Sequence, residues 1–104
     1  MDIYTDYLLK NFGHANLKGF ECLSYIYNKC DLKLNLCYIY KEVERKLKLS
    51  GSSERNIRHY IEKIIEQIGL KNLEDILGCK ADRPDKFSNK AFIFAVKLRA
   101  ENDK

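Results

Sequence analysis

Residues 36–68 read LCYIYKEVERKLKLSGSSERNIRHYIEKIIEQI, and this stretch determines the expected fold. The apolar residues of its first part recur at i, i+3, i+4, i+7 and i+11, as Leu36, Ile39, Tyr40, Val43 and Leu47. This spacing predicts one amphipathic helix, with Asn35 as its N-cap. After the polar turn at residues 50–53, a second apolar stripe consists of Ile57, Ile61, Ile64 and Ile68. The stripe predicts a helix from about Ser53 that Gly69 ends. Two amphipathic helices joined by a short turn that contains Gly are typical of a helix-turn-helix.

The remaining segments also carry apolar residues at helical spacing rather than at the alternation of a strand. Further helices are expected near residues 3–12, 17–26, 73–77 and from Asn89, as N-cap, onward. Gly13 and Gly78 are placed to end two of them, and residues 79–87, which hold the single Pro, indicate a loop. The sequence therefore predicts an all-α fold, with one domain over residues 1–104. This domain is a compact bundle of about six helices with the helix-turn-helix at about residues 36–68.

The chain has 104 residues, of which 45% are apolar, and this length suits one domain but not two. No stretch approaches the roughly 18 uninterrupted apolar residues that a membrane span requires. Residues 1–6 carry two acidic residues and no basic one, unlike a secretory or mitochondrial signal. We therefore expect a soluble, cytoplasmic domain that has no membrane partner.

The four cysteines do not show the CxxC spacing of zinc knuckles or redox motifs. Thiols at such positions are typical of a reduced, cytosolic chain. The four cysteines, which are expected to be mostly buried, are Cys22, Cys30, Cys37 and Cys79. The sequence predicts no metal site, no cofactor and no small-molecule substrate.

The positive charge is concentrated in the two central helices. The chain has a formal net charge of +4, and residues 41–63 hold seven basic and four acidic residues, so that three of the four net charges lie there. A charged helix face is often only a solvated surface, but the predicted helix-turn-helix gives this segment a second interpretation. The first helix would hold the second so that the N-terminal turn of the second enters the major groove of DNA.

A helical wheel with Ile57 at the centre of the buried face places Arg55 and His59 on the outward face. Arg55 is expected to read a guanine, because its planar guanidinium matches the O6/N7 acceptor pair. Arg58 lies on the flank, where a long side chain reaches a phosphate, and Glu54 suits acceptance from a cytosine amino group. Ser52, Ser53 and the backbone amides of the first turn are expected to anchor phosphates.

Residues 54–62 (ERNIRHYIE) also resemble the recognition helix of a known family. The C-terminal DNA-binding domain of the sporulation master response regulator, stage 0 sporulation protein A, reads Glu-Arg-x-Ile-Arg-His-x-Ile-Glu there. The likeness extends to both sides of this helix and covers nearly the whole chain. It includes residues 17–20 (LKGF), 40–43 (YKEV), 86–93 (KFSNKAFI) and 97–101 (KLRAE).

The resemblance implies a six-helix domain that binds a short promoter box as an activator or repressor, with copies arranged in tandem or as a dimer on DNA. It implies that Arg55 and Glu54 read bases, that Arg58 and His59 lie against the DNA backbone, and that Lys86 adds a phosphate contact. The full set of expected DNA-binding residues is Lys48, Ser52, Ser53, Glu54, Arg55, Arg58, His59 and Lys86.

This chain departs from the family pattern at several positions. It leaves no room for the receiver domain that precedes the family domain, so we expect a stand-alone regulator without control by aspartyl phosphorylation. The turn between the two helices is one residue shorter than in the family, and Ser52 and Ser53 replace a family Arg and an apolar residue. Glu44 stands where helix-turn-helix proteins favour a small residue, and it is expected either to tilt the helix pair or to point outward.

Two other classes of function compete with DNA binding. An enzyme is not expected, because the chain has no Gly-rich phosphate loop and no nucleophile motif, and His59 with Glu62 resembles a surface pair. A protein-interaction regulator that pairs with a full-length response regulator, or with another partner, remains the alternative. The seven Tyr and five Phe suit such an interface, although they suit a core equally well.

Overall fold

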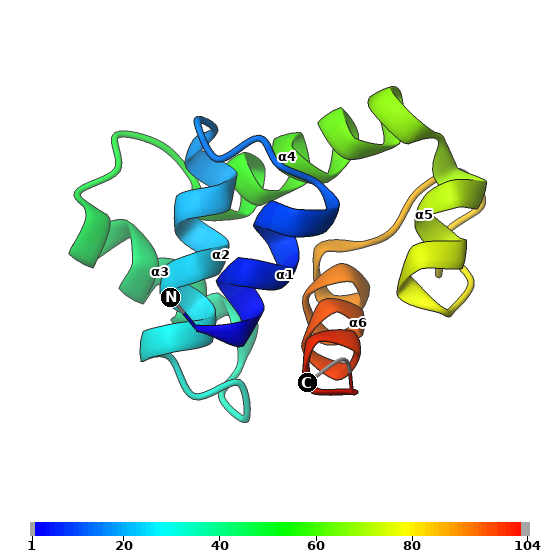
Figure 1. Ribbon diagram of the computed structural model, residues 1–104. Coiled ribbons are helices and arrows are strands. Elements are labelled where there is room, and N and C mark those ends of the chain that lie inside the picture. The colour runs from blue at the N-terminus through cyan, green and yellow to red at the C-terminus, as the bar shows by residue number, and fades with distance from the viewer. Residues whose placement is uncertain (1, 103–104) are drawn as a thin grey trace.

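The computed structural model describes residues 2–102 and contains six α-helices and, over those residues, no strand. The helices are α1 (Ile3–Asn11), α2 (Lys18–Lys29), α3 (Leu36–Leu47), α4 (Ser53–Ile68), α5 (Leu70–Leu77) and α6 (Asn89–Asn102). The expected all-α bundle is confirmed (Figure 1). None of these helices combines the length and the apolar character needed to cross a bilayer.

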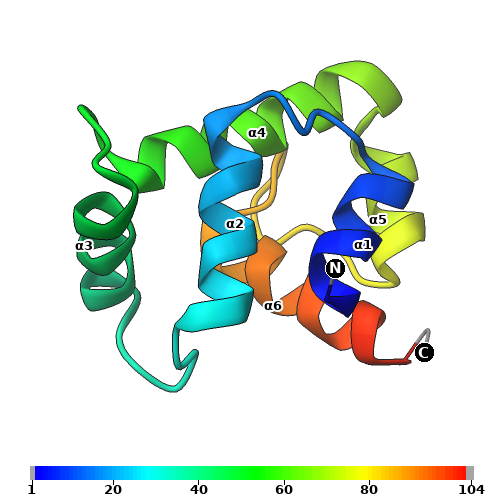
Figure 2. The ribbon, with the colours of Figure 1, turned by 60° about the vertical axis from the view of Figure 1, so that its left-hand side comes forward.

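Helix α2 lies at the centre of the molecule and packs most extensively against α4 (Figure 2). Its residues Cys22, Leu23 and Ile26 are fully buried. They belong to one continuous apolar core, to which the other five helices contribute side chains. Helix α3 packs on α2 and α4 and lies at one side of the bundle, so its outer face is left to solvent.

The contact between α2 and α4 depends on a missing side chain. A Cβ atom at Gly19 would lie 2.6 Å from Cβ of Tyr60 and would overlap the carbonyl oxygen of Asn56. The fully buried Tyr60 donates its hydroxyl to the carbonyl of Gly13 at 3.1 Å, which fastens the α1–α2 connection to the same helix. Glycine at position 19 therefore sets how closely α4 approaches the centre of the bundle.

Helix α6 begins differently from the prediction. The Ser88 hydroxyl accepts a hydrogen bond from the Ala91 amide at 3.1 Å, so Ser88 caps the helix and the expected cap at Asn89 is wrong. The side chain of Asn89 instead donates to a carbonyl of α4. Both residue types are good caps, and only tertiary contacts distinguish them.

The cysteine environments also differ from the prediction. Cys22 is fully buried and Cys30 is half-buried, but Cys37 and Cys79 are exposed, so the expectation of mostly buried thiols is wrong for these two. Cys37 lies in the first turn of α3 away from its apolar stripe, and Cys79 follows the end of α5. Among residues 2–102, no three His, Cys, Asp or Glu side chains gather closely enough to hold a metal ion.

Candidate nucleic-acid interface

The connection between α3 and α4 is a tight turn with defined caps at both ends. Lys48 ends α3 in the left-handed conformation (φ 54°, ψ 45°), and its amide donates to the carbonyl of Glu44. Ser52 caps α4, because its hydroxyl accepts from the amide of Arg55 at 3.2 Å. Asn56 strengthens this cap, since its side-chain amide donates to the Ser52 carbonyl at 2.9 Å. The turn thus presents the first residues of α4 in a fixed conformation.

Glu44 joins the two helices on the inner side of the turn. Its Oε2 atom accepts from the amide of Ser53 at 2.8 Å and from the hydroxyl of Ser53 at 3.1 Å. The same hydroxyl lies 2.9 Å from the carbonyl oxygen of Tyr40. The expectation that Glu44 points outward is therefore wrong. Glu44 acts as a carboxylate cap on the N-terminus of α4.

This arrangement corrects the expected role of Ser53. Its side chain is completely buried, and both its hydroxyl and its amide are bonded inside the protein, so it is unable to anchor a phosphate. The Arg55 amide is likewise occupied by Ser52. The carboxylate of Glu44 also offsets part of the positive end of the α4 dipole. Anion attraction at this helix end therefore depends on side chains more than on backbone amides.

The other expected residues do lie on the surface. Glu54, Arg55, Arg58 and His59 are exposed along the first half of α4, Ser52 is half-buried at its cap, and Lys48 and Lys86 are exposed on the flanking segments. Arg55, Arg58, Lys48 and Lys86 form no ion pair with any other residue in 2–102. Their charges are therefore free to act on an external anion.

A hollow of about 360 Å³ runs along the turn at the start of α4. Three cationic residues, Lys18, Lys48 and Arg55, are among its lining residues, and no acidic residue is. Lys18 belongs to α2, and sequence reasoning missed it because nothing in the periodicity indicates that α2 begins beside this turn. Its amine also pairs with the exposed Glu21 at 3.4 Å, a contact that solvent weakens.

The start of α6 is brought against the same end of α4. The side-chain amide of Asn89 donates to the carbonyl of Glu54 at 2.9 Å. Burial raises the pKa of Tyr40 in α3, and a hydrogen bond with Asn89 partly offsets this. Lys86 therefore belongs to a segment that approaches the N-terminus of α4. Lys86 itself is exposed, three residues before Asn89.

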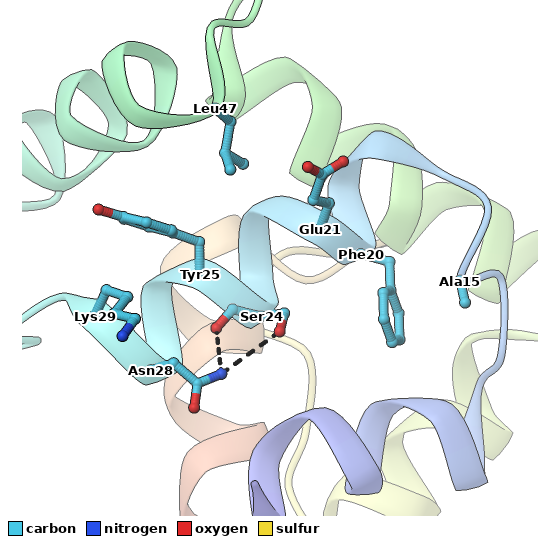
Figure 3. Close-up of a pocket in the computed structure, with 8 residues that line it drawn as sticks. All are labelled: Ala15, Phe20, Glu21, Ser24, Tyr25, Asn28, Lys29 and Leu47. Carbon is cyan, nitrogen blue, oxygen red and sulfur yellow. Dashed lines mark hydrogen bonds between the residues drawn. The ribbon is translucent and has the colours of Figure 1, made fainter. Parts of the chain in front are cut away.

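A separate groove of about 570 Å³ follows the outer side of α2 (Figure 3). Phe20, Tyr25 and Leu47 supply its apolar wall, and Asn28 donates to the carbonyl of Ser24 at 2.7 Å at one side of it. None of the residues expected to contact DNA lines this groove. It is therefore distinct from the surface at the start of α4.

The candidate interface thus consists of an exposed, cation-bearing half-helix beside a fixed turn. It includes the acidic Glu54, and the exposed Glu62 follows it on the same helix, so the charge of this face of α4 is mixed rather than uniformly positive. Comparison of the chain with family models, with curated proteins and with solved structures found no match.

Proposed function

We propose that this chain is a sequence-specific, double-stranded DNA-binding transcriptional regulator. Helices α3 and α4 would act as a helix-turn-helix, with α4 in the major groove. The observation that carries this proposal is that Arg55 and Arg58 project, without ion-pair partners in residues 2–102, from a helix whose opposite face is fully buried. A rigidly held helix with free guanidinium groups is what direct base reading requires.

The proposed roles of the surface residues combine their positions with the resemblance to the sporulation regulator. Arg55 lies at the third position of α4 and would make the bidentate contact to a guanine, with Glu54 accepting from a cytosine amino group. Arg58 and His59 would lie against the backbone one turn later, and Lys48, Ser52 and Lys86 would contact phosphates on either side. Ser53 has no direct role, because it is buried.

The resemblance to the sporulation regulator supports a more specific proposal. The chain would act in the bacterial cytoplasm on promoter boxes of that family's type, as tandem copies or as a dimer on DNA. The mixed charge of the α4 face, which includes Glu54 and Glu62, suits a protein that depends on base contacts rather than on charge alone.

Fluorescence anisotropy with two labelled duplexes tests this function. One duplex carries the family-type promoter box, the other is scrambled at equal composition, and each titration is repeated at several salt concentrations. Preferential binding to the box that persists at physiological salt would support a sequence-reading regulator. Selection of bound duplexes from a random pool extends the test to a box that differs from the family type.

Weak and equal binding to both duplexes that vanishes with salt would contradict the proposal. It would favour the alternative, a regulator that pairs with another protein. Lys71→Ala serves as the control for overall charge, because Lys71 is an exposed cation of α5 outside the candidate surface.

A further inference from the structure

A second apolar hollow lies between the α2–α3 connection and the first turns of α6. Its volume is about 600 Å³. Four apolar side chains line it, namely Leu32, Leu34, Leu36 and Phe94. Leu34 is 55% exposed, which is a large exposure for a leucine beside three other apolar groups. Contiguous exposed apolar surface of this kind often marks an interaction site.

The connection that carries Leu34 is held by local hydrogen bonds. The Asp31 carboxylate accepts from the amide of Lys33 at 2.9 Å, and the Asp31 carbonyl accepts from the amide of Leu34 at 3.0 Å. Asn35 then caps α3 by accepting from the Cys37 amide at 2.7 Å. Leu34 therefore remains exposed in a turn whose backbone is already bonded on both sides of it.

The other wall of the hollow is fixed to the core. The hydroxyl of Tyr27 in α2 donates to the carbonyl of Ile93 at 2.7 Å, immediately before Phe94 in α6. Both walls are thus attached to α2. Hydrogen bonds within the protein hold the two walls, so an occupant would have little backbone to order on binding.

The two charged residues that line the hollow, Lys33 and Lys90, are both basic. Neither forms an ion pair with another residue in 2–102. The nearby carboxylate of Asp31 bonds the backbone of its own turn. An apolar floor flanked by two unpaired ammonium groups is complementary to apolar side chains flanked by carboxylates.

We propose that this hollow is a docking site for an acidic amphipathic helix of a partner protein. Apolar side chains on one face of that helix would pack between Leu34 and Phe94. Aspartate or glutamate residues beside them would pair with Lys33 and Lys90. The site is additional to the proposed DNA surface, because none of the residues that line it is among those expected to contact DNA.

The hollow and the DNA surface nevertheless share one structural element. Lys90 follows Asn89, whose side chain bonds the Glu54 carbonyl at the start of α4. Along α3 the hollow borders the N-terminal end, at Leu36, and the DNA surface borders the C-terminal end, at Lys48, whereas at the start of α6 the two surfaces adjoin. A partner helix and a DNA duplex would thus occupy neighbouring sites on one small domain.

Titration of the isotope-labelled chain with synthetic helical peptides tests the proposal by NMR. The first peptide has leucines on one helical face and glutamates beside them. A second replaces the glutamates by lysines, and a third has the composition of the first in scrambled order. We expect the first peptide alone to bind, with chemical-shift changes concentrated at residues 32–36 and 90–94.

Matched variants separate this site from general stickiness. Leu34→Asp should weaken binding of the acidic peptide by about tenfold or more, as loss of a central apolar contact does. The control is Leu98→Asp, because Leu98 lies in α6, is 61% exposed and does not line the hollow. This variant should change the affinity by less than about twofold. Reversing both lysines, Lys33→Glu with Lys90→Glu, should abolish the preference for the acidic peptide, whereas Lys71→Glu should not.

Several outcomes would overturn the proposal. Equal binding of the acidic, basic and scrambled peptides would show unspecific adhesion, as would equal losses from Leu34→Asp and Leu98→Asp. Chemical-shift changes at the hollow when a DNA duplex is added, lost in the double lysine variant, would assign the surface to nucleic acid instead. Far-UV circular dichroism of every variant confirms that it is folded, and the DNA assay is scored separately, so each proposal fails on its own measurement.

Discussion

The Glu44 carboxylate in α3 accepts hydrogen bonds from both the amide and the hydroxyl of Ser53, the first residue of α4. Helix-turn-helix proteins favour a small residue at the position of Glu44, but here the charged side chain joins α3 to α4. The sequence alone had suggested that Glu44 faces solvent and that Ser53 anchors a phosphate, whereas the two side chains bond each other inside the protein. The Glu44 carboxylate also lies at the start of α4, next to the surface that is proposed to contact DNA.

Glu44→Ala should lower the free energy of unfolding by about 1–3 kcal/mol, because it leaves the buried Ser53 hydroxyl and amide with fewer acceptors. Glu44→Gln keeps an oxygen acceptor and should cost less. If the chain binds DNA as proposed, Glu44→Gln should also raise affinity at low salt, because it removes a negative charge near α4. Urea unfolding and anisotropy measure the two effects.

Glu42→Gln is the control for this prediction. Glu42 is on the same helix but pairs with the exposed Arg45 and does not contact Ser53. Its loss should change stability by less than about 1 kcal/mol. Equal effects of the two Gln variants on DNA affinity would show that only net charge matters, and not the position of Glu44.

Arg55→Ala should weaken binding to the preferred duplex by about 1–3 kcal/mol and reduce discrimination against the scrambled one. Arg58→Ala should weaken both duplexes similarly and reduce the salt dependence by about one phosphate contact. Anisotropy titrations at several salt concentrations distinguish the two patterns. Unchanged affinity and unchanged preference in Arg55→Ala would remove Arg55 from the proposed reading role.

Gly19→Ala should destabilise the fold by about 1–3 kcal/mol, because the added methyl group overlaps Cβ of Tyr60 and the Asn56 backbone, so that one of the two helices must shift. Gly51→Ala is its control, since a Cβ there meets no atom within 4 Å. That variant should change stability by no more than about 0.5 kcal/mol. Thermal unfolding of both variants checks the difference, and a neutral Gly19→Ala would mean that α2 and α4 pack less closely than described.

Acid should weaken the first helix through Asp2. Burial opposes ionisation of this carboxyl group, but hydrogen bonds from Thr5 and Asn28 outweigh it, so the pKa of Asp2 lies below its ordinary value of 3.8. The contribution of ionised Asp2 is therefore complete above that ordinary value and is lost as the pH falls through the lowered one.

Asp2→Asn should remove this part of the acid sensitivity and lower stability near neutral pH by about 1 kcal/mol. Asp6→Asn removes a carboxylate at an exposed position in the same first turn and serves as the matched control. Unfolding free energies across the acid range test both variants. An acid profile that Asp2→Asn leaves unchanged would contradict the assignment.

Thiol reactivity should follow burial. Cys37 and Cys79 are exposed and should be alkylated readily in the folded chain. Cys22 should resist, because it is fully buried and burial raises the pKa of its thiol to about 11. Mass spectrometry after brief alkylation reports each site, and the same reaction in urea should modify all four. Rapid modification of native Cys22 would place it outside the core.

The helical periodicity was sufficient to predict most of the fold, because each helix buries one stripe. The expected bounds of α3 and α4, Leu36 to Leu47 and Ser53 to Ile68, agree with the structure, since Asn35, Gly69 and the serine-rich turn mark their ends. The start of α5 at Leu70 was missed by three residues. Its first residues follow Gly69 directly, without a side-chain cap to reveal the boundary.

The burial of Ser53 was missed, although the same helical pattern predicts it. Ser53 lies four residues before Ile57, on the continuation of the buried stripe, so its burial was readable from the helical wheel. Its partner Glu44 was not readable. A hydrogen bond between a glutamate and a serine nine positions later depends on how α3 and α4 turn toward each other, which single-helix patterns do not specify.

The contacts that hold α4 in place include uncharged groups, namely the close approach at Gly19, the Tyr60 hydroxyl and the Asn89 amide. The charged one is the Glu44 carboxylate, whose partner Ser53 is completely buried. Dissolved ions screen exposed charges but barely affect packing or a hydrogen bond to a buried group. The scaffold and its cations should therefore respond differently to ionic strength. A salt titration of this protein would report on the cations at its surface, while the geometry that presents them stays constant.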